Sequence, residues 1–163
     1  MSRQSLIFFG IGLAVIAAAV TLMLWSNKGS HLVLQGKILK VRTLSLEPDA
    51  TIAAIDFRVT NPSNFVYMIK DAVVRMDTAD GKTIDADTIS RDDTDRTFAY
   101  YHLLGPKYNQ TLIERDRIEP HQTTDRMIAV RIPAAALAVD NRKGLHLKLD
   151  EMDGGTSEIR EQR

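Results

Sequence analysis

Hydrophobic and polar positions follow two different patterns along this chain. Residues 6–25 (LIFFGIGLAVIAAAVTLMLW) carry no charge and no side-chain amide, whereas apolar and polar residues alternate over much of the chain beyond residue 31. A helix of 20 residues is about 30 Å long, which matches the hydrocarbon thickness of a bilayer. Alternation with a period of two predicts β-strands with one buried face. The chain is therefore predicted to consist of one transmembrane helix followed by a β-domain.

The apolar run has three interpretations. A cleaved signal peptide has an apolar core of about 7 to 15 residues before a small-residue cleavage site, and Ala17–Ala19 offer such a site. Val20 and Leu22–Trp25 continue the apolar run beyond these alanines, which favours an uncleaved anchor. A buried helix of a soluble fold is disfavoured because the run has no polar face. A lipid-modified lipoprotein is excluded because the chain has no cysteine.

The flanks of the run define the predicted layout. Residues 1–5 form a short tail, 6–25 the membrane helix, 26–30 a linker, 31–153 a β-sandwich domain and 154–163 a C-terminal edge strand or tail. Basic residues lie on both sides of the helix, so the positive-inside rule does not decide its orientation. A short N-terminal tail before a large domain is the usual layout of an exported domain. We expect a single-pass protein whose C-terminal domain is extracytoplasmic, on the periplasmic side in a bacterium.

Small residues recur at every fourth position of the apolar run. Gly10, Ala14 and Ala18 share one helix face, and this spacing lets two membrane helices approach closely. One interpretation is a homo-oligomer formed through the transmembrane helix, but the spacing does not establish it. The alternative is that glycine and alanine are simply common in such helices.

Alternation is clearest in the first half of the domain. The segment 31–47 is predicted to be one long strand interrupted near Gly36. A second strand follows, in which Ala53, Ile55, Phe57 and Val59 share the buried face. Asn61 and Pro62 end it, because proline cannot donate to a strand ladder and asparagine bonds to neighbouring backbone groups.

The next strand changes parity. Phe65, Tyr67 and Ile69 alternate with polar residues, and then Ala72, Val74 and Met76 continue the alternation one position out of step. A shift of one residue exchanges the two faces unless a bulge absorbs it, so a bulge or break is predicted near Lys70 and Asp71. Asp80-Gly81 predicts a hairpin turn into a strand over 82–90. Further strands are predicted over 124–132, 145–149 and 156–160, with a loop or single helical turn at 133–138.

The middle of the domain has a different composition. A short helix is predicted over 95–104, capped by Thr94 or Asp93 and stopped by Gly105-Pro106. This crossover is expected to cover an open edge or end of the core, and its aromatic side chains are the candidate interaction surface. They are Phe98, Tyr100, Tyr101 and Tyr108.

Six or seven short strands with one helical crossover predict a mainly β fold, an immunoglobulin-like antiparallel β-sandwich. The stretch IDFRVTNPSNFVYMIKDAVVRMDTADGK, Ile55 to Lys82, resembles the late-embryogenesis-abundant type 2 family, also called the WHy (water stress and hypersensitive response) domain. Asn61 and Pro62 occupy the places of that family's Asn-Pro pair. The later IEPHQTTDRMIAVRIP, Ile118 to Pro133, resembles the family's turn and following strand, with His121 where glycine is more usual.

This resemblance covers residues 31–151 and carries its own expectations. It implies a seven-stranded sandwich without catalytic residues, associated with stress tolerance or with accessory roles at a membrane. The helical insert between residues 95 and 108 departs from the family's plain pattern.

Composition and motifs narrow the function further. The chain has 21 basic and 21 acidic residues with no concentrated basic face, which argues against nucleic-acid binding. No nucleophile or metal-ligand motif joins the four scattered histidines, so no catalytic residue, metal or cofactor is predicted. The histidines are His31, His102, His121 and His146. The acidic cluster at Asp85, Asp87, Asp92, Asp93 and Asp95 lacks the EF-hand glycine and glutamate and is interpreted as a salt-bridged loop rather than a calcium site.

Two functional hypotheses follow. The first is a membrane-anchored, non-catalytic binding or accessory module with an unidentified protein partner. The second is a stress-protective structural protein of the late-embryogenesis-abundant type 2 kind. A hydrolytic or metal-dependent enzyme ranks third.

Overall fold

The computed structural model describes residues 12–22 and 33–161, and the chain divides into two compact units at residues 31 and 32. Residues 12–22 of the first unit are helical. Within the described residues, no helix combines the length and apolar character that a membrane span requires. The remainder of the predicted span, residues 6–11 and 23–25, lies outside them. Of the predicted association stripe, Ala14 and Ala18 lie on this helix, and Gly10 is not among the described residues.

The second unit is mainly β. Its elements are β1 Gln35–Glu47, β2 Ala50–Thr60, β3 Tyr67–Asp77, β4 Thr83–Thr88, α2 Arg91–Tyr100, the 3-10 helix η1 His102–Leu104, β5 Arg117–Ile118, β6 Thr123–Ile132, α3 Ala136–Asp140, β7 Gly144–Glu151 and β8 Thr156–Arg160. All strand pairs are antiparallel, as predicted.

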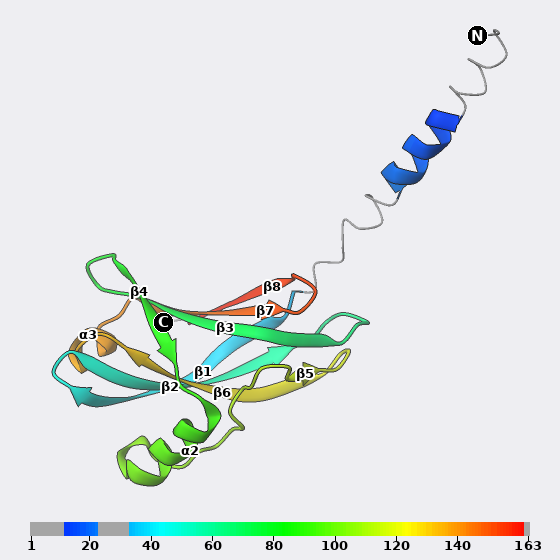
Figure 1. The fold of residues 1–163 in the computed structure, drawn as a ribbon. Coiled ribbons are helices and arrows are strands. Elements are labelled where there is room, and N and C mark those ends of the chain that lie inside the picture. The colour runs from blue at the N-terminus through cyan, green and yellow to red at the C-terminus, as the bar shows by residue number, and fades with distance from the viewer. Residues whose placement is uncertain (1–11, 23–32, 162–163) are drawn as a thin grey trace, which may run out of the picture. The chain divides into compact units, whose positions relative to one another are not determined.

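The strands form two layers that share β4 (Figure 1). One layer has the order β1-β2-β6-β4 and the other β3-β7-β8. Strand β4 belongs to both, because residues 83–86 pair with β3 and residues 87–88 pair with β6. With the two-residue strand β5 left aside, this is the strand order of a constant-type immunoglobulin sandwich. The predicted β-sandwich is thus confirmed.

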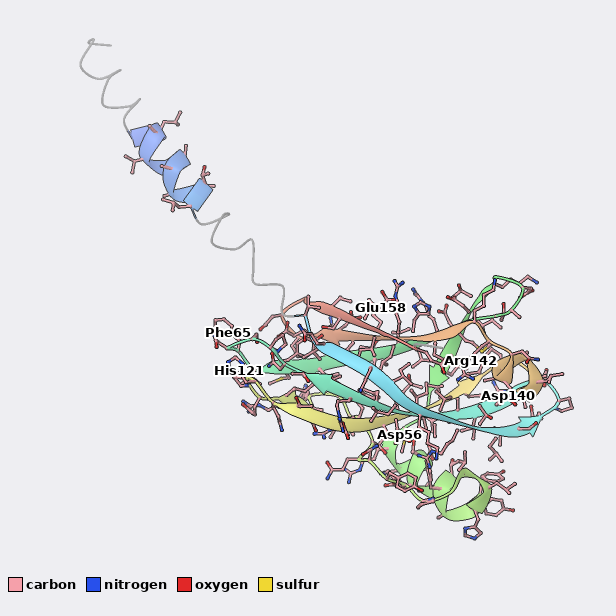
Figure 2. All side chains as sticks on the ribbon, turned by 180° about the vertical axis from the view of Figure 1, so that it is seen from behind. Asp56, Phe65, His121, Asp140, Arg142 and Glu158 are labelled. Atoms are coloured by element: carbon pink, nitrogen blue, oxygen red, sulfur yellow. The ribbon has the colours of Figure 1, made fainter. Side chains whose placement is uncertain are left out.

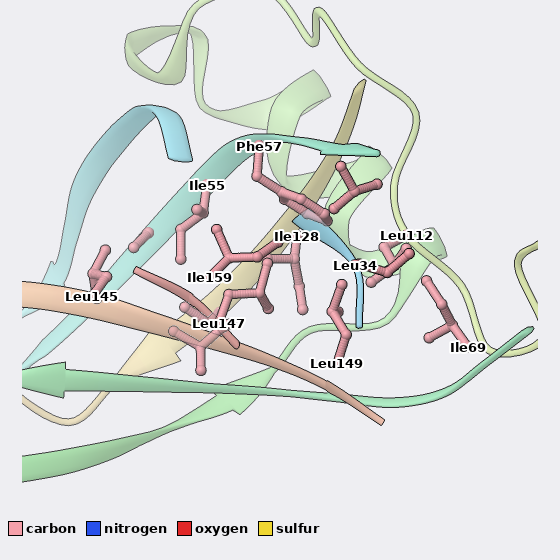
Figure 3. Packing of buried hydrophobic residues seen from close by; sticks show 14 of the residues in the cluster. Leu34, Ile55, Phe57, Ile69, Leu112, Ile128, Leu145, Leu147, Leu149 and Ile159 are labelled. Carbon is pink, nitrogen blue, oxygen red and sulfur yellow. The ribbon is translucent and has the colours of Figure 1, made fainter. Parts of the chain in front are cut away.

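The core lies between the layers (Figure 3). Ile55 and Phe57 of β2 face Leu147 and Leu149 of β7, and all four are fully buried. These residues occupy the positions that alternation assigned to the inner face. The open edges of the two layers also approach each other, since the Leu34 backbone N–H donates to Ser157 Oγ at 2.8 Å.

Two local predictions for β3 are confirmed. The pairing of β3 with β7 shifts register between Ile69 and Asp71, which places the predicted bulge at Lys70. The β3–β4 connection turns at Asp80 and Gly81, and Gly81 has φ +87°, a conformation that L side chains rarely adopt. The turn is closed by the Thr78 N–H, which donates to the Lys82 carbonyl at 2.8 Å.

The structure differs from the predictions at Gly36 and at both ends of the predicted helix. Gly36 does not interrupt β1; it pairs with Val59, and β1 shifts register between Ile38 and Lys40 instead. A Cβ at Gly36 would lie 2.6 Å from the Arg58 carbonyl oxygen, so glycine serves close packing there. The predicted helix 95–104 begins earlier, at residue 91, and ends at residue 100.

The earlier helix start has a clear cause. Ser90 Oγ accepts from the Asp93 N–H at 3.2 Å and donates to the Asp93 carboxylate at 2.8 Å, which is a reciprocal cap on the first turn. Ser90 is therefore the N-cap, rather than the predicted Thr94 or Asp93. After Tyr100 the chain tightens into η1, which ends at Leu104, directly before the Gly105-Pro106 stop signal.

The Asn61-Pro62 motif closes the loop between β2 and β3. The buried Asn61 side-chain amide donates to the carbonyls of Phe65 (2.7 Å) and Ile118 (2.9 Å), and its oxygen accepts from the Ser63 N–H (3.1 Å) and hydroxyl (2.7 Å). Asn61 thus bonds within its own loop and across to the last residue of β5. This places Phe65 on a braced turn at one end of the sandwich.

Candidate functional site

The crossover between β4 and β6, residues 90–111, covers the outer face of the layer formed by β1, β2 and β6 (Figure 1). Beneath it lies a second apolar cluster, separate from the core between the layers. Its buried members are Leu44, Ile52, Ala54, Phe98, Leu104, Met127 and Ala129. Strand β2 is consequently buried on both faces from Ala50 to Phe57. The prediction that the crossover covers an edge or end of the core is therefore wrong, because it covers an outer face.

Arg42 fixes the crossover to the sheet. Its guanidinium donates to the carbonyls of Leu104 and Pro106, both at 2.8 Å, and forms an ion pair with Asp56 at 2.8 Å. The side chains of Arg42 and Asp56 are only 9% and 4% exposed. The second oxygen of Asp56 accepts from the Asn109 amide at 2.8 Å. Apart from the ion pair itself and Arg42 Nε, which has no hydrogen-bond partner, the polar groups around these two buried charges come from the crossover.

Aromatic rings complete the environment of Arg42. The guanidinium carbon lies 5.0 Å from the centre of the Phe98 ring and 5.3 Å from that of Tyr108. A guanidinium within about 6 Å of an aromatic ring is attracted by the ring's quadrupole. Lys107 also pairs with Asp95, which ties the part of the crossover that follows η1 to α2. These contacts give the crossover a defined shape.

The four predicted interface residues differ in how much of each side chain is exposed to solvent. Phe98 is buried in the second cluster and offers no open surface, whereas Tyr101 is half-buried against that cluster and exposes only part of its side chain. Tyr100 and Tyr108 are exposed, Tyr100 at 77%. Tyr100 packs edge-on against Tyr101, with ring centres 4.8 Å apart. The predicted aromatic surface is therefore corrected to its two exposed members.

Sequence reasoning missed Leu103, the most exposed large apolar side chain of the described residues at 90%. The predicted continuous helix over 95–104 gave no reason to expect Leu103 to be exposed and Leu104 buried. The 3-10 turn of η1 does, since Leu104 is buried below the crossover and Leu103 points to solvent. We call Tyr100, Leu103 and Tyr108 the crossover surface.

A lateral cleft of about 380 Å³ opens beside the crossover, where β4 leaves β3 to join β6. Its floor includes the buried side chains of Ile69, Leu112 and Ile128. Lys70, Arg91 and Glu114 line its mouth, so charges of both signs surround it. The cleft has the volume of a small binding pocket. Its mixed rim does not select for a ligand of one charge.

His121 and His146 belong to separate hydrogen-bond networks. His121 is bonded to Asn64 at 2.9 Å, while His146 lies between Asp77 and Glu158, each 2.8 Å from one ring nitrogen. Hydrogen bonds from Thr83 and then His146 lower the pKa of Asp77. Hydrogen bonds from Arg160 and His146 lower the pKa of Glu158. His146 thus stabilises two carboxylates across the outer face of β3, β7 and β8.

The acidic cluster is distributed over two elements. Asp85 lies on β4 and pairs with Arg75 at 2.9 Å, whereas Asp93 lies on α2 and pairs with Arg96 at 3.3 Å. Across residues 12–22 and 33–161, no group of three or more histidine, aspartate and glutamate side chains could hold a metal ion.

Two buried titratable groups lie near the end of the sandwich that carries Phe65. Burial raises the pKa of Tyr67, whose hydroxyl donates to the Leu149 carbonyl at 2.8 Å. Burial also raises the pKa of Glu151, and the neighbouring Asp153 adds to the shift. Both shifts follow from the enclosure of polar groups at the end of the core.

Comparison with known proteins yields little. No family model and no curated protein matches the chain. Among solved structures, an uncharacterized beta-sandwich protein from Clostridium difficile 630 aligns with a TM-score of 0.40 and 14% identity, over 78% of this chain and 85% of that chain. A similarity at this level carries no argument on function, and the architecture rests on the strand pairing of the chain itself.

Proposed function

We propose that this protein is a membrane-anchored, non-catalytic binding module whose crossover surface contacts a protein partner. The proposal rests on the crossover: its residues Leu104, Pro106 and Asn109 are hydrogen-bonded to the buried Arg42–Asp56 pair of the sheet, yet the same segment turns large apolar side chains to solvent. Isolated exposed apolar residues are normal on protein surfaces, but three on one braced segment form a preorganised contact. Aromatic side chains are also enriched in protein interfaces.

The anchor is part of this proposal. It is supported by the uncharged run from residue 6 to residue 25. A membrane helix would concentrate the β-sandwich on a surface, where a weak contact through Tyr100 and Leu103 is strengthened by a high effective concentration. Carbonate extraction of membranes tests the anchor. The chain is expected to stay with the membrane pellet, and its release into the supernatant would contradict a transmembrane segment.

The crossover surface is tested by photo-crosslinking in native membranes. A photoreactive amino acid in place of Leu103 is expected to give a discrete adduct, and the purified partner from that adduct is expected to bind the purified chain. Adding Tyr100→Ala should abolish the adduct. The matched control carries the photoreactive residue in place of Leu137, which is 72% exposed on α3. The same adducts from both positions would rule out a specific contact at the crossover.

The stress-protective role is the second candidate. It is favoured by one conformational detail: His121, which stands where the resembled family more usually has glycine, has φ +58°. A positive φ is the conformation that favours glycine. Deletion of the gene is then expected to lower survival of drying, freezing and salt shock. Unchanged survival under all three conditions would remove this candidate.

A further inference from the structure

The chain enters the sandwich at one end, which we call the proximal end. Val33 and Leu34 precede β1, and Gln35 at the start of β1 pairs with Thr60 at the end of β2. Three loops therefore share this end with Val33, namely residues 61–66, 119–122 and 152–155. Figure 2 shows Phe65 and His121 together at this end and Asp140 and Arg142 at the opposite, distal end.

Exposed apolar side chains occur on two of these loops and at the point where the chain enters. Phe65 is 61% exposed, and Val33 and Met152 are exposed as well. Phe65 does not project from a loose loop, because Asn61 and Ser63 both donate to its carbonyl oxygen, at 2.7 and 2.9 Å. Met152 is tied to β3 by its N–H, which donates to the Met68 carbonyl at 3.1 Å. The proximal end thus holds apolar side chains outward from braced loops.

Chain length restricts what can meet this end. Seven residues, 26–32, separate the predicted anchor from Val33. Even when fully extended, that connection reaches at most about 28 Å, whatever its conformation. The distal end is farther away, because the 11 residues of β3 alone span about 33 Å between the two ends. A chain anchored through residues 6–25 therefore holds its proximal end within about 28 Å of the anchor, whereas its distal end reaches the lipid headgroups only when the sandwich tilts over onto its side.

We propose that the proximal end of the sandwich contacts the bilayer, with Phe65 and Met152 inserted at the headgroup boundary. This inference rests on the anchor in the proposed function. Aromatic and apolar side chains gain free energy at the boundary between headgroups and acyl chains, and the tether removes most of the cost of bringing them there. The contact orients the sandwich, so that the distal end and α3 face away from the membrane.

Depth-dependent fluorescence quenching tests this orientation. The chain contains no cysteine, so single cysteines can be introduced and labelled with a polarity-sensitive dye. Met152→Cys reports on the proximal end, and Leu137→Cys on α3 is the matched control at the distal end. The full chain is reconstituted into phosphatidylcholine vesicles with and without brominated acyl chains. Several-fold stronger quenching is expected at position 152 than at position 137.

A further variant identifies the side chain responsible. Phe65→Ser in the Met152→Cys chain is expected to reduce quenching towards the level at position 137, with an unchanged thermal midpoint because Phe65 is exposed. Equal quenching at positions 152 and 137, in chains that float with the vesicles, would overturn the contact while leaving the anchor intact. Chains that fail to float with the vesicles would overturn the anchor, and the contact with it.

Discussion

The buried ion pair between Arg42 and Asp56 makes a quantitative prediction. Arg42→Met retains an apolar stem of similar length but removes the cation, the ion pair and the two hydrogen bonds to the carbonyls of Leu104 and Pro106. Asp56 is then left as a buried carboxylate whose remaining partner is Asn109. Removal of one partner from a buried ion pair costs about 3–5 kcal/mol, because the other charge stays uncompensated. We expect the free energy of unfolding to fall by this amount.

Urea and thermal denaturation of the full chain, followed by far-UV circular dichroism, measure this loss. The unfolding entropy of a domain of roughly 130 residues is about 0.27 kcal/mol/K, so the thermal midpoint should fall by about 11–18 °C. Amide hydrogen exchange adds spatial detail. Protection in α2 is expected to decrease more than protection in β7, since the crossover depends on Arg42 and the inner core does not.

An exposed ion pair between β2 and β6 provides the control. Arg58 and Asp125 pair at 2.6 Å, but their side chains are 47% and 31% exposed. Arg58→Met should therefore cost less than about 1 kcal/mol, because water already screens the pair. The double variant Arg42→Met with Asp56→Leu should be more stable than Arg42→Met alone, since no buried charge is left. Equal effects of Arg42→Met and Arg58→Met would refute the assignment of a buried, desolvated pair.

Three further predictions concern other parts of the fold. Gly36→Ala places a Cβ 2.6 Å from both the Arg58 carbonyl oxygen and the Ile159 side chain, so urea denaturation should show a loss of about 1–3 kcal/mol; an unchanged midpoint would contradict the close approach. His121→Gly relieves the positive φ of +58°, so it should be about 1 kcal/mol more stable than His121→Ala in the same assay, whereas the reverse order would show that no strain is stored there. Asp77 and Glu158 have pKa values below their ordinary 3.8 and 4.5, so they bind protons more weakly in the folded than in the unfolded chain. Their stabilisation is complete above about pH 5 and is lost as the pH falls through the lowered pKa values. The combined Asp77→Asn and Glu158→Gln variant should show a flatter dependence of thermal midpoint on pH below pH 5 than the unmodified chain, and an equally steep dependence would exclude these carboxylates as the cause.

Local patterns were sufficient to predict most strands and one irregularity. Alternation identified the inner-facing residues of β2, such as Ile55 and Phe57, because one face of a strand repeats every second residue. The change of parity after Ile69 correctly predicted the bulge at Lys70, since a strand cannot exchange faces without one. Both inferences use only neighbours along the chain.

The second apolar layer could not be found in this way. Alternation assigns Ala54 and Asp56 to a solvent face, yet both are buried under the crossover. A signal was present, since Ile52 to Ile55 form a continuous apolar run, which is typical of a strand buried on both faces. The ion pair of Asp56 with Arg42 depends on the register between β1 and β2, which the order of residues within either strand does not reveal. Strand β5 has only two residues, which is too short for an alternating pattern. Neither leaves a periodic trace in the sequence.

The two ends of the sandwich have a mechanical consequence. The chain enters β1 at the proximal end and leaves β8 at the distal end, where Arg160 pairs with His146 near the start of β7. Tension applied between Val33 and Glu161 therefore pulls β1 and β8 along their own axes, in opposite directions. The interstrand hydrogen bonds of β1 with β2 and of β8 with β7 would then resist together in shear, instead of opening one after another. A domain connected in this way transmits a pulling force between Val33 and Glu161 without first detaching an edge strand one hydrogen bond at a time.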